Sequence, residues 1–173
     1  MARVTLRGAG TAKKTAAALL LLAVIAGVAV WLQMRSIPSA PHAANAKCDD
    51  VTAKTPENVH GHDRDWFTGE GVEAWGDHEV ILRCGVTEPT PNINLCITAN
   101  GVDWVLDEKR LAKDGVAVLT TYGRSPAVEV TYHGAREEAA GVVASLNSAV
   151  KWIPQESKCI GASDINALQG STI

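Results

Sequence analysis

Hydrophobic and polar residues follow two different patterns along this chain. Ala16 to Leu32 contains no charged or strongly polar side chain, and the next charge is Arg35. With its flanks, the segment 15–34 would form a helix of about 30 Å, long enough to cross a bilayer. From Cys48 onward, short apolar runs alternate with polar residues, which is typical of a folded domain.

The second pattern predicts β-strands separated by turn residues. The β-rich runs are 80–84, 95–99, 102–107, 116–122 and 128–132. Val80 to Leu82 is continuously apolar and indicates a strand buried on both faces. Asn100-Gly101 predicts a two-residue hairpin turn, because a type I′ turn needs a positive φ at both positions.

A helix over about 135–152 follows the strands. Its apolar face is formed by Ala139, Val142, Val143, Leu146, Ala149 and Val150. Pro154 prevents the helix from continuing. Together these elements predict an α+β fold, in which a small antiparallel sheet of about four strands carries one packed helix.

The charges around the apolar segment predict its orientation. Four cations and no acid precede it, and one cation follows, so the positive-inside rule places the N-terminus in the cytoplasm. The alternative is a cleaved signal peptide with Ala44-Asn45-Ala46 as its small-residue site. That site lies 14 residues beyond Leu32, however, and the apolar core is longer than is usual for a signal peptide. An uncleaved signal-anchor, single-pass in the cell membrane, is therefore the favoured interpretation.

The chain is thus predicted to have five segments. They are a cytoplasmic basic segment at 1–14, a transmembrane signal-anchor at 15–34, a Pro/Ala/Ser linker at 35–47, an extracytoplasmic domain at 48–160 and a flexible tail at 161–173. The residues from Lys47 onward hold 11 Lys and Arg against all 19 Asp and Glu of the chain. This acidic balance argues against binding nucleic acid, which calls for clustered cations.

All four cysteines lie after the apolar segment, at Cys48, Cys84, Cys96 and Cys159. An even number of cysteines in an oxidising compartment predicts two disulfides. Of the three pairings, Cys84–Cys96 with Cys48–Cys159 is favoured, because the first closes a Pro-rich loop between neighbouring strands and the second joins the ends of the domain. A zinc site is less consistent with the spacing, since no two cysteines are separated by two to four residues.

One metal-like cluster occurs in the polar segment before the strands. His60, His62, Asp63 and Asp65 could supply zinc or copper ligands, although a solvated polar loop explains the same residues. The ligand set is incomplete, so we expect no metal and no other cofactor.

Catalytic patterns are weak. Asp77 and Glu79 could form a carboxylate pair for cell-wall glycoside chemistry, but Asp77 lies in a turn-like Gly-Asp-His context that favours backbone capping. No G-x-S-x-G sequence and no Gly-rich phosphate loop are present. The chain is therefore expected not to be an enzyme.

Four residues are candidates for contact with a partner. Trp66 and Phe67 form an aromatic pair in the polar segment, whereas Trp75 and Trp104 flank strands and are expected to be buried. Ala23 and Gly27 form a small-xxx-small pair in the apolar segment that would let another helix approach.

Several of these motifs occur together in a known pattern: AWG-x-x-x-x-x-LRCGV at 74–86, a cysteine at 96, GVDW at 101–104 and TYGR-x-PAVEV at 121–130. With a first cysteine after the anchor and a last one after a helix, this resembles an actinobacterial family of small signal-anchored, four-cysteine envelope proteins catalogued as a domain of unknown function. The resemblance covers about Cys48 to Cys159 and implies an actinobacterial host. It transfers no catalytic residue, and the histidine cluster lies outside the pattern.

The sequence thus favours a non-enzymatic, membrane-anchored extracytoplasmic protein. Its expected partner is another envelope or membrane protein, for example a complex such as an actinobacterial respiratory supercomplex, of which it would be an accessory or assembly subunit. Two alternatives stay open: a metal- or cell-wall-ligand-binding domain, and a wall-acting enzyme that uses Asp77 or Glu79.

Overall fold

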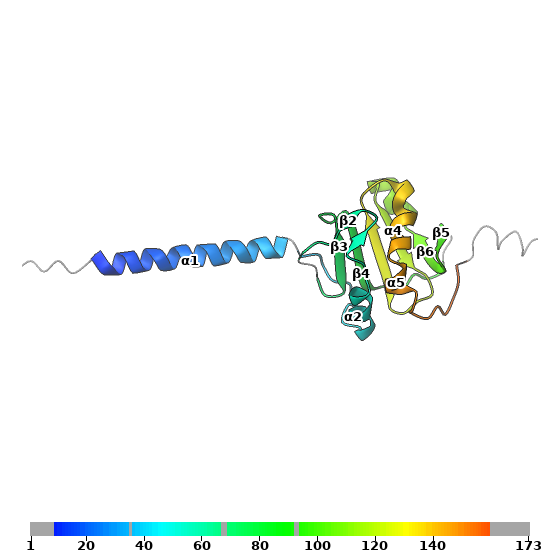
Figure 1. Ribbon diagram of the computed structural model, residues 1–173, viewed down its shortest axis with the longest axis horizontal. Helices are drawn as coiled ribbons and strands as arrows, with labels where there is room; N and C mark the ends of the chain where they lie inside the picture. Colours follow the sequence, from blue (N-terminus) through cyan, green and yellow to red (C-terminus); the bar gives the residue numbers. More distant parts are fainter. Residues whose placement is uncertain (1–8, 35, 67–68, 92–93, 160–173) are drawn as a thin grey trace, which may run out of the picture. The chain divides into compact units, whose positions relative to one another are not determined.

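A computed structural model describes residues 9–34, 36–66, 69–91 and 94–159 (Figure 1). The chain divides into two compact units, residues 1–36 and residues 37–173. In the first unit, α1 (Ala9–Met34) is a continuous helix of 26 residues. Within the part of the chain that is described, no helix is long and apolar enough to cross a membrane, so the span predicted at 15–34 is not confirmed.

The second unit is built on a six-stranded antiparallel sheet rather than the predicted four-stranded one. Its strands, in spatial order, are β3 (Val72–Trp75), β4 (Val80–Val86), β8 (Ala127–Tyr132), β7 (Ala117–Thr121), β6 (Val102–Leu106) and β5 (Cys96–Ala99). Five of these strands correspond to the five β-rich runs of the sequence, and the sixth, β3, lies outside them and pairs with β4 through a turn containing three consecutive residues of positive φ at 76–78. Such a turn gives little hairpin signal, because only one of those three residues is glycine.

The Asn-Gly hairpin is confirmed. Asn100 and Gly101 have φ values of 49° and 82°, and Ala99 pairs directly with Val102. Positive φ at both positions gives the turn the twist that the flanking strands require. The hairpin therefore joins β5 to β6 in the predicted register.

The predicted helix at 135–152 is present as three short pieces. They are η1 (Arg136–Glu138), α4 (Ala139–Ser145) and α5 (Asn147–Val150). The break lies at Leu146, whose φ and ψ of −90° and 2° depart from α-helical values. The predicted apolar face is nevertheless correct, since Val142, Val143 and Leu146 are fully buried in the core between these helices and the sheet. The α+β fold class is thus confirmed.

Residues 37–57 pack against the sheet domain, although the sequence predicted a linker at 35–47. The His42 N–H donates to the Gly85 carbonyl at 2.9 Å, and a Cβ on Gly85 would lie 2.3 Å from the His42 carbonyl group, so only glycine permits this approach. The helix α2 (Ala46–Ala53) follows, with the side chain of Asn45 accepting from the Lys47 N–H. These contacts attach the start of the domain to the end of β4.

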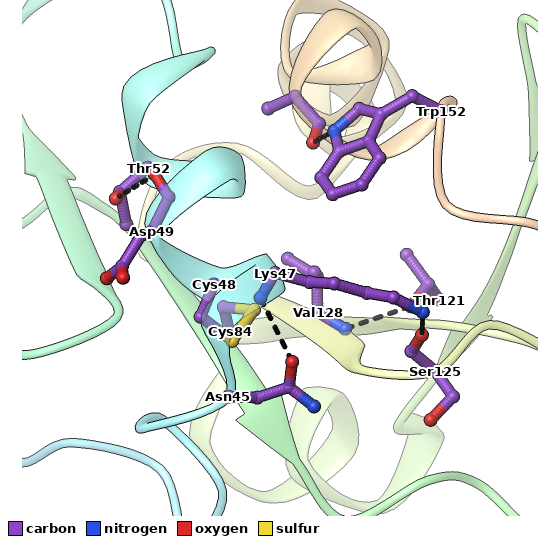
Figure 2. Close-up of a disulfide and its surroundings, with 11 residues drawn as sticks. Asn45, Lys47, Cys48, Asp49, Thr52, Cys84, Thr121, Ser125, Val128 and Trp152 are labelled. Atoms are coloured by element: carbon purple, nitrogen blue, oxygen red, sulfur yellow. Dashed lines mark hydrogen bonds between the residues drawn. A yellow bond between two sulfur atoms is a disulfide. The ribbon is translucent and has the colours of Figure 1, made fainter.

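The predicted disulfide pairing is wrong. Cys48 bonds to Cys84, and Cys96 bonds to Cys159. The prediction assumed that β4 and β5 are neighbours, but β8, β7 and β6 lie between them. Cys84 instead meets α2, as Figure 2 shows, and the Lys47 Nζ beside this bond donates to the Ser125 carbonyl at 2.9 Å.

Three small elements complete the domain. The hairpin of β1 (Asn58–Val59) and β2 (His62–Asp63) precedes the sheet, and α3 (Glu108–Asp114) connects β6 to β7. Asp107 caps α3 by accepting from the N–H groups of Lys109 and Arg110, and Gly115 ends it with a φ of 70°. None of the seven residues of α3 is fully buried, so this helix lies at the rim of the core.

Candidate binding site

Two motif residues of the chain, Asp103 and Arg124, belong to one buried network rather than to an open site. The Arg124 side chain is 5% exposed and donates to the backbone carbonyls of Ile153, Lys151 and Gly101. Burial lowers the pKa of Arg124, against the opposing effect of the Asp103 charge. Arg124 therefore attaches the segment after α5 to the hairpin between β5 and β6.

Asp103 attaches the last described residues to the same place. Its carboxylate accepts from Thr98 Oγ1 at 2.8 Å, from Gln155 Nε2 at 2.8 Å and from the Cys159 N–H at 3.2 Å. Burial raises the pKa of Asp103, but these hydrogen bonds outweigh it and hold the pKa below the ordinary value. The GVDW and TYGR motifs thus fix the C-terminal segment to the sheet.

The AWG and LRCGV motifs are also structural. Trp75 is fully buried and its Nε1 donates to the Pro56 carbonyl at 3.0 Å, while Cys84 forms the disulfide to α2. Trp104 is fully buried as well, so both tryptophans pack as predicted. Arg83 forms an ion pair with Glu129 across β4 and β8. These side chains are thus engaged in contacts that hold the fold together.

The predicted metal-binding residues contact different partners. Asp63 accepts from Asn58 Nδ2 at 2.9 Å within the β1–β2 hairpin, and both Asp65 oxygens accept from backbone N–H groups in the turn before β4. His60 Nε2 lies 4.0 Å from a carboxylate oxygen of Glu138. In the described part of the chain, no group of three or more His, Cys, Asp or Glu side chains could hold a metal ion.

The proposed catalytic carboxylates also have separate surroundings. Asp77 is exposed, and its N–H donates to Asp65 Oδ1 at 2.8 Å, so the carboxylate that caps this turn is that of Asp65 and not, as predicted, that of Asp77. Glu79 lies 3.7 Å from His62 Nδ1. Glu79 and Glu138 are near the buried Tyr132, whose hydroxyl donates to Glu138 Oε2 at 2.7 Å. Burial first, and then these carboxylates, raise the pKa of Tyr132 to about 12, so the phenol remains a hydrogen-bond donor at neutral pH.

The substitution Tyr132→Phe tests this assignment. Below pH 10 the wild-type protein should be more stable than the variant by about 1 kcal/mol, the usual value of one hydrogen bond. Because the pKa is higher in the folded state, the unfolded tyrosine ionises first, and the difference should shrink as pH rises from 10 to about 12. Urea unfolding of both proteins at pH 9 and pH 11 measures it. A difference independent of pH would contradict the raised pKa.

An apolar hollow of about 610 Å³ opens on the surface of the domain. It lies over β5, β6 and β7, with α3 on one side and η1–α4 on the other. The apolar lining consists of Leu95, Ile97, Leu106, Leu111, Ala112, Ala117, Leu119, Ala139 and Ala140. Three charged residues, Glu108, Arg136 and Glu137, also line it, and Arg136 Nε lies 3.5 Å from Glu137 Oε1.

The hollow adjoins the edge of the sheet. The strand β5 is the last in the spatial order and pairs with β6 alone. Leu95, just before β5, is 51% exposed, and Leu95 and Ile97 both face the hollow, as alternate residues of an extended chain must. This arrangement combines an apolar surface with a row of backbone groups on the outer side of an edge strand.

The sequence missed this site because its residues come from six separate elements. Leu119 and Ala117 were expected as ordinary strand residues, and Leu111 lies in the highly charged segment between two predicted strands. The predicted contact residues lie elsewhere: Trp66 is 80% exposed in the loop before β3, and Ala23 and Gly27 lie one turn apart on α1. Phe67 lies outside the described residues.

The fold and its hollow define a class: a disulfide-stabilised α+β domain whose motif residues hold the chain together around an apolar surface. The chain belongs to the family described as "Protein of unknown function (DUF3515)", whose model matches residues 14–158. Membership of a family of unknown function is therefore confirmed. Neither a curated protein nor a solved structure gives a significant match.

Proposed function

We propose that this protein is a non-enzymatic, membrane-anchored extracytoplasmic protein whose domain binds an extended apolar segment of another envelope or membrane protein. The observation that carries the proposal is the apolar hollow of about 610 Å³ beside β5. A half-exposed leucine at its mouth indicates that covering the hollow would remove apolar surface from water.

The edge position of β5 supports an extended segment as the occupant. A peptide that pairs with an exposed edge strand gains main-chain hydrogen bonds, and its alternate side chains enter pockets on one face of the sheet. Beside β5, those side chains would lie next to Leu95 and Ile97. An accessory subunit that joins a larger complex by adding a strand fits this geometry.

The disulfides support an extracytoplasmic location. All four cysteines are paired, and such bonds persist in oxidising compartments. The anchor is supported by the sequence from Ala16 to Leu32, which has no charge and belongs to the single helix α1. The cations that precede this segment favour the N-terminus inside the cell.

A photo-crosslinking residue on α3 tests the proposal. Ala112 lines the hollow and is exposed, whereas its neighbour Lys113 is 82% exposed and does not line it. We expect a crosslinker at 112, in the full chain in its native membrane, to form one discrete adduct with a peptide of another membrane protein. The same crosslinker at 113 should form none. Mass spectrometry of the adduct identifies the attached segment.

The substitution Leu95→Lys provides the second arm. It places a charge at the mouth of the hollow and should reduce the adduct at 112 about tenfold, since losing the burial of a leucine costs about 1.5 kcal/mol. Equal adducts at 112 and 113, or an adduct at 112 that Leu95→Lys leaves unchanged, would refute binding in the hollow.

A small apolar ligand is the second candidate, because about 610 Å³ lies within the usual range for small-molecule sites. It corresponds to the cell-wall-ligand alternative that the sequence left open. The same crosslinker distinguishes the two candidate occupants. An adduct at 112 with a lipid or a wall component, and none with a protein, would show that the hollow binds a small ligand.

A further inference from the structure

Trp66 is the most exposed large aromatic side chain among the described residues, with 80% of its surface open to solvent. Trp75 and Trp104 are completely buried, and Trp152 is 36% exposed. An indole ring has an apolar body and one N–H donor, so it is favoured where one side is apolar and the other is wet. The position of Trp66 on the domain decides which such surface it can meet.

The loop that carries Trp66 is held on both sides. Before it, Arg64 forms an ion pair with Glu73 at 2.9 Å, and the Asp65 N–H donates to the Ala74 carbonyl at 2.8 Å. After it, the Val72 N–H donates to the Gly69 carbonyl at 3.0 Å. Both ends of the loop are therefore fixed to the sheet next to β3.

This loop packs against the first residues of the second unit. A Cβ on Gly69 would lie 2.5 Å from the Ile37 carbonyl oxygen and 3.1 Å from Ser39 Oγ, so the two chain segments touch there. Gly69 is three residues from Trp66, and Ile37 is three residues from the last residue of α1, Met34. Each of these three-residue stretches reaches at most about 11 Å when fully extended.

We propose that Trp66 inserts into the outer headgroup region of the lipid bilayer and so orients the domain on the membrane surface. The inference rests on the proposed function, because it needs α1 to be a membrane anchor. Given that anchor, the entry point at Ile37 is held next to the bilayer by the length of the chain, and the loop of Trp66 lies against that entry point. Tryptophan is enriched at the membrane interface because its apolar ring can lie in the lipid while its N–H stays in contact with water and headgroups.

Fluorescence quenching by brominated lipids tests the contact. The full chain is reconstituted into phosphatidylglycerol vesicles whose acyl chains are brominated either near the headgroup end or near the methyl end. The chain has five tryptophans, and Trp31 lies in the predicted anchor. The variants Trp31→Phe, Trp66→Phe and Trp152→Phe each remove one of them, so the quenched fraction of each tryptophan is obtained by difference.

We expect lipid brominated near the headgroup end to quench Trp66 more strongly than lipid brominated near the methyl end, and Trp31 to be quenched as well. Trp152, which is 36% exposed and has Lys54 Nζ 4.6 Å from its ring centroid, serves as the matched control and should be quenched less than Trp66. If Trp31 is quenched and Trp66 is not, the anchor stands and the contact of Trp66 with lipid is overturned. If neither is quenched, the anchor fails, and the inference fails with it.

Discussion

Replacing Cys48 and Cys84 together by alanine should lower the free energy of unfolding by about 4 kcal/mol. The bond closes a loop of 36 residues, for which the chain-entropy model gives a stabilisation close to this value. Both sulfurs belong to the fully buried core, so the alanines also leave a cavity between α2 and β4. Urea unfolding of the oxidised full chain measures the loss.

The second disulfide provides the matched control. Cys96–Cys159 closes a longer loop of 63 residues, so loop entropy alone predicts a slightly larger effect for its removal. Cys96 and Cys159 are only half-buried, however, and their replacement by alanine opens no cavity in the core. We therefore expect the Cys48/Cys84 variant to be the less stable of the two. The opposite order would show that Cys48–Cys84 acts through loop entropy alone.

Replacing Arg124 by alanine should destabilise the domain by about 3–5 kcal/mol, the range typical of breaking a buried charge network. The change removes the donors for three backbone carbonyls and one of the positive charges that act on Asp103, the other being Lys158. Of the three, the carbonyl of Ile153 is the buried one, and a buried carbonyl that loses its partner costs about 1–3 kcal/mol. Urea unfolding gives the total, and amide hydrogen exchange over 151–159 gives the local effect.

Two further substitutions, Arg136→Ala and Arg124→Lys, distinguish this role from the mere loss of a positive charge. Arg136 is exposed and paired with its neighbour Glu137, so Arg136→Ala should change stability by no more than about 0.5 kcal/mol. Arg124→Lys keeps the charge but not the planar set of donors, and should recover only part of the loss. If Arg124→Ala is as stable as Arg136→Ala and amide hydrogen exchange over 151–159 is unchanged, Arg124 does not hold the C-terminal segment to the sheet.

Local patterns predicted the local parts of this fold. The Asn-Gly turn needed only two residues to specify it, and the apolar spacing from Ala139 to Val150 correctly identified the buried face of the helices. The break at Leu146 was not visible, because leucine is a good helix former and the departure from helical geometry comes from packing on the sheet. The strand β3 was missed because it has only four residues, too few to show the alternation of apolar and polar side chains that indicates a strand.

Long-range pairing was the main error. The cysteines were assigned on the assumption that strands next to each other in sequence are neighbours in the sheet. The segment after β4 instead passes three strands before β5 begins, and β8 takes the place beside β4. That choice moves Cys84 away from Cys96 and toward α2, so the correct pairing followed from topology and not from loop length.

The apolar hollow also depends on contacts between segments that are distant in the sequence, so it could not be predicted from local patterns. Its residues are ordinary apolar side chains that any core would contain, and their exposure depends on how far α3 and α4 stand apart above the sheet. The motifs, by contrast, are visible in sequence but serve the fold: Asp103 and Arg124 hold the C-terminal segment, and Trp75 holds the segment before the sheet.

By itself, the sequence determined the α+β class, the hairpin, the buried helical face, the presence of two disulfides and membership of the family, because each depends on residues close together in the chain or on composition. Only the tertiary structure decided the strand order, the disulfide partners, the separate surroundings of the histidines and carboxylates, and the apolar hollow beside β5. Each of these depends on which distant segments meet, and that is set by the packing of the whole domain rather than by any local pattern.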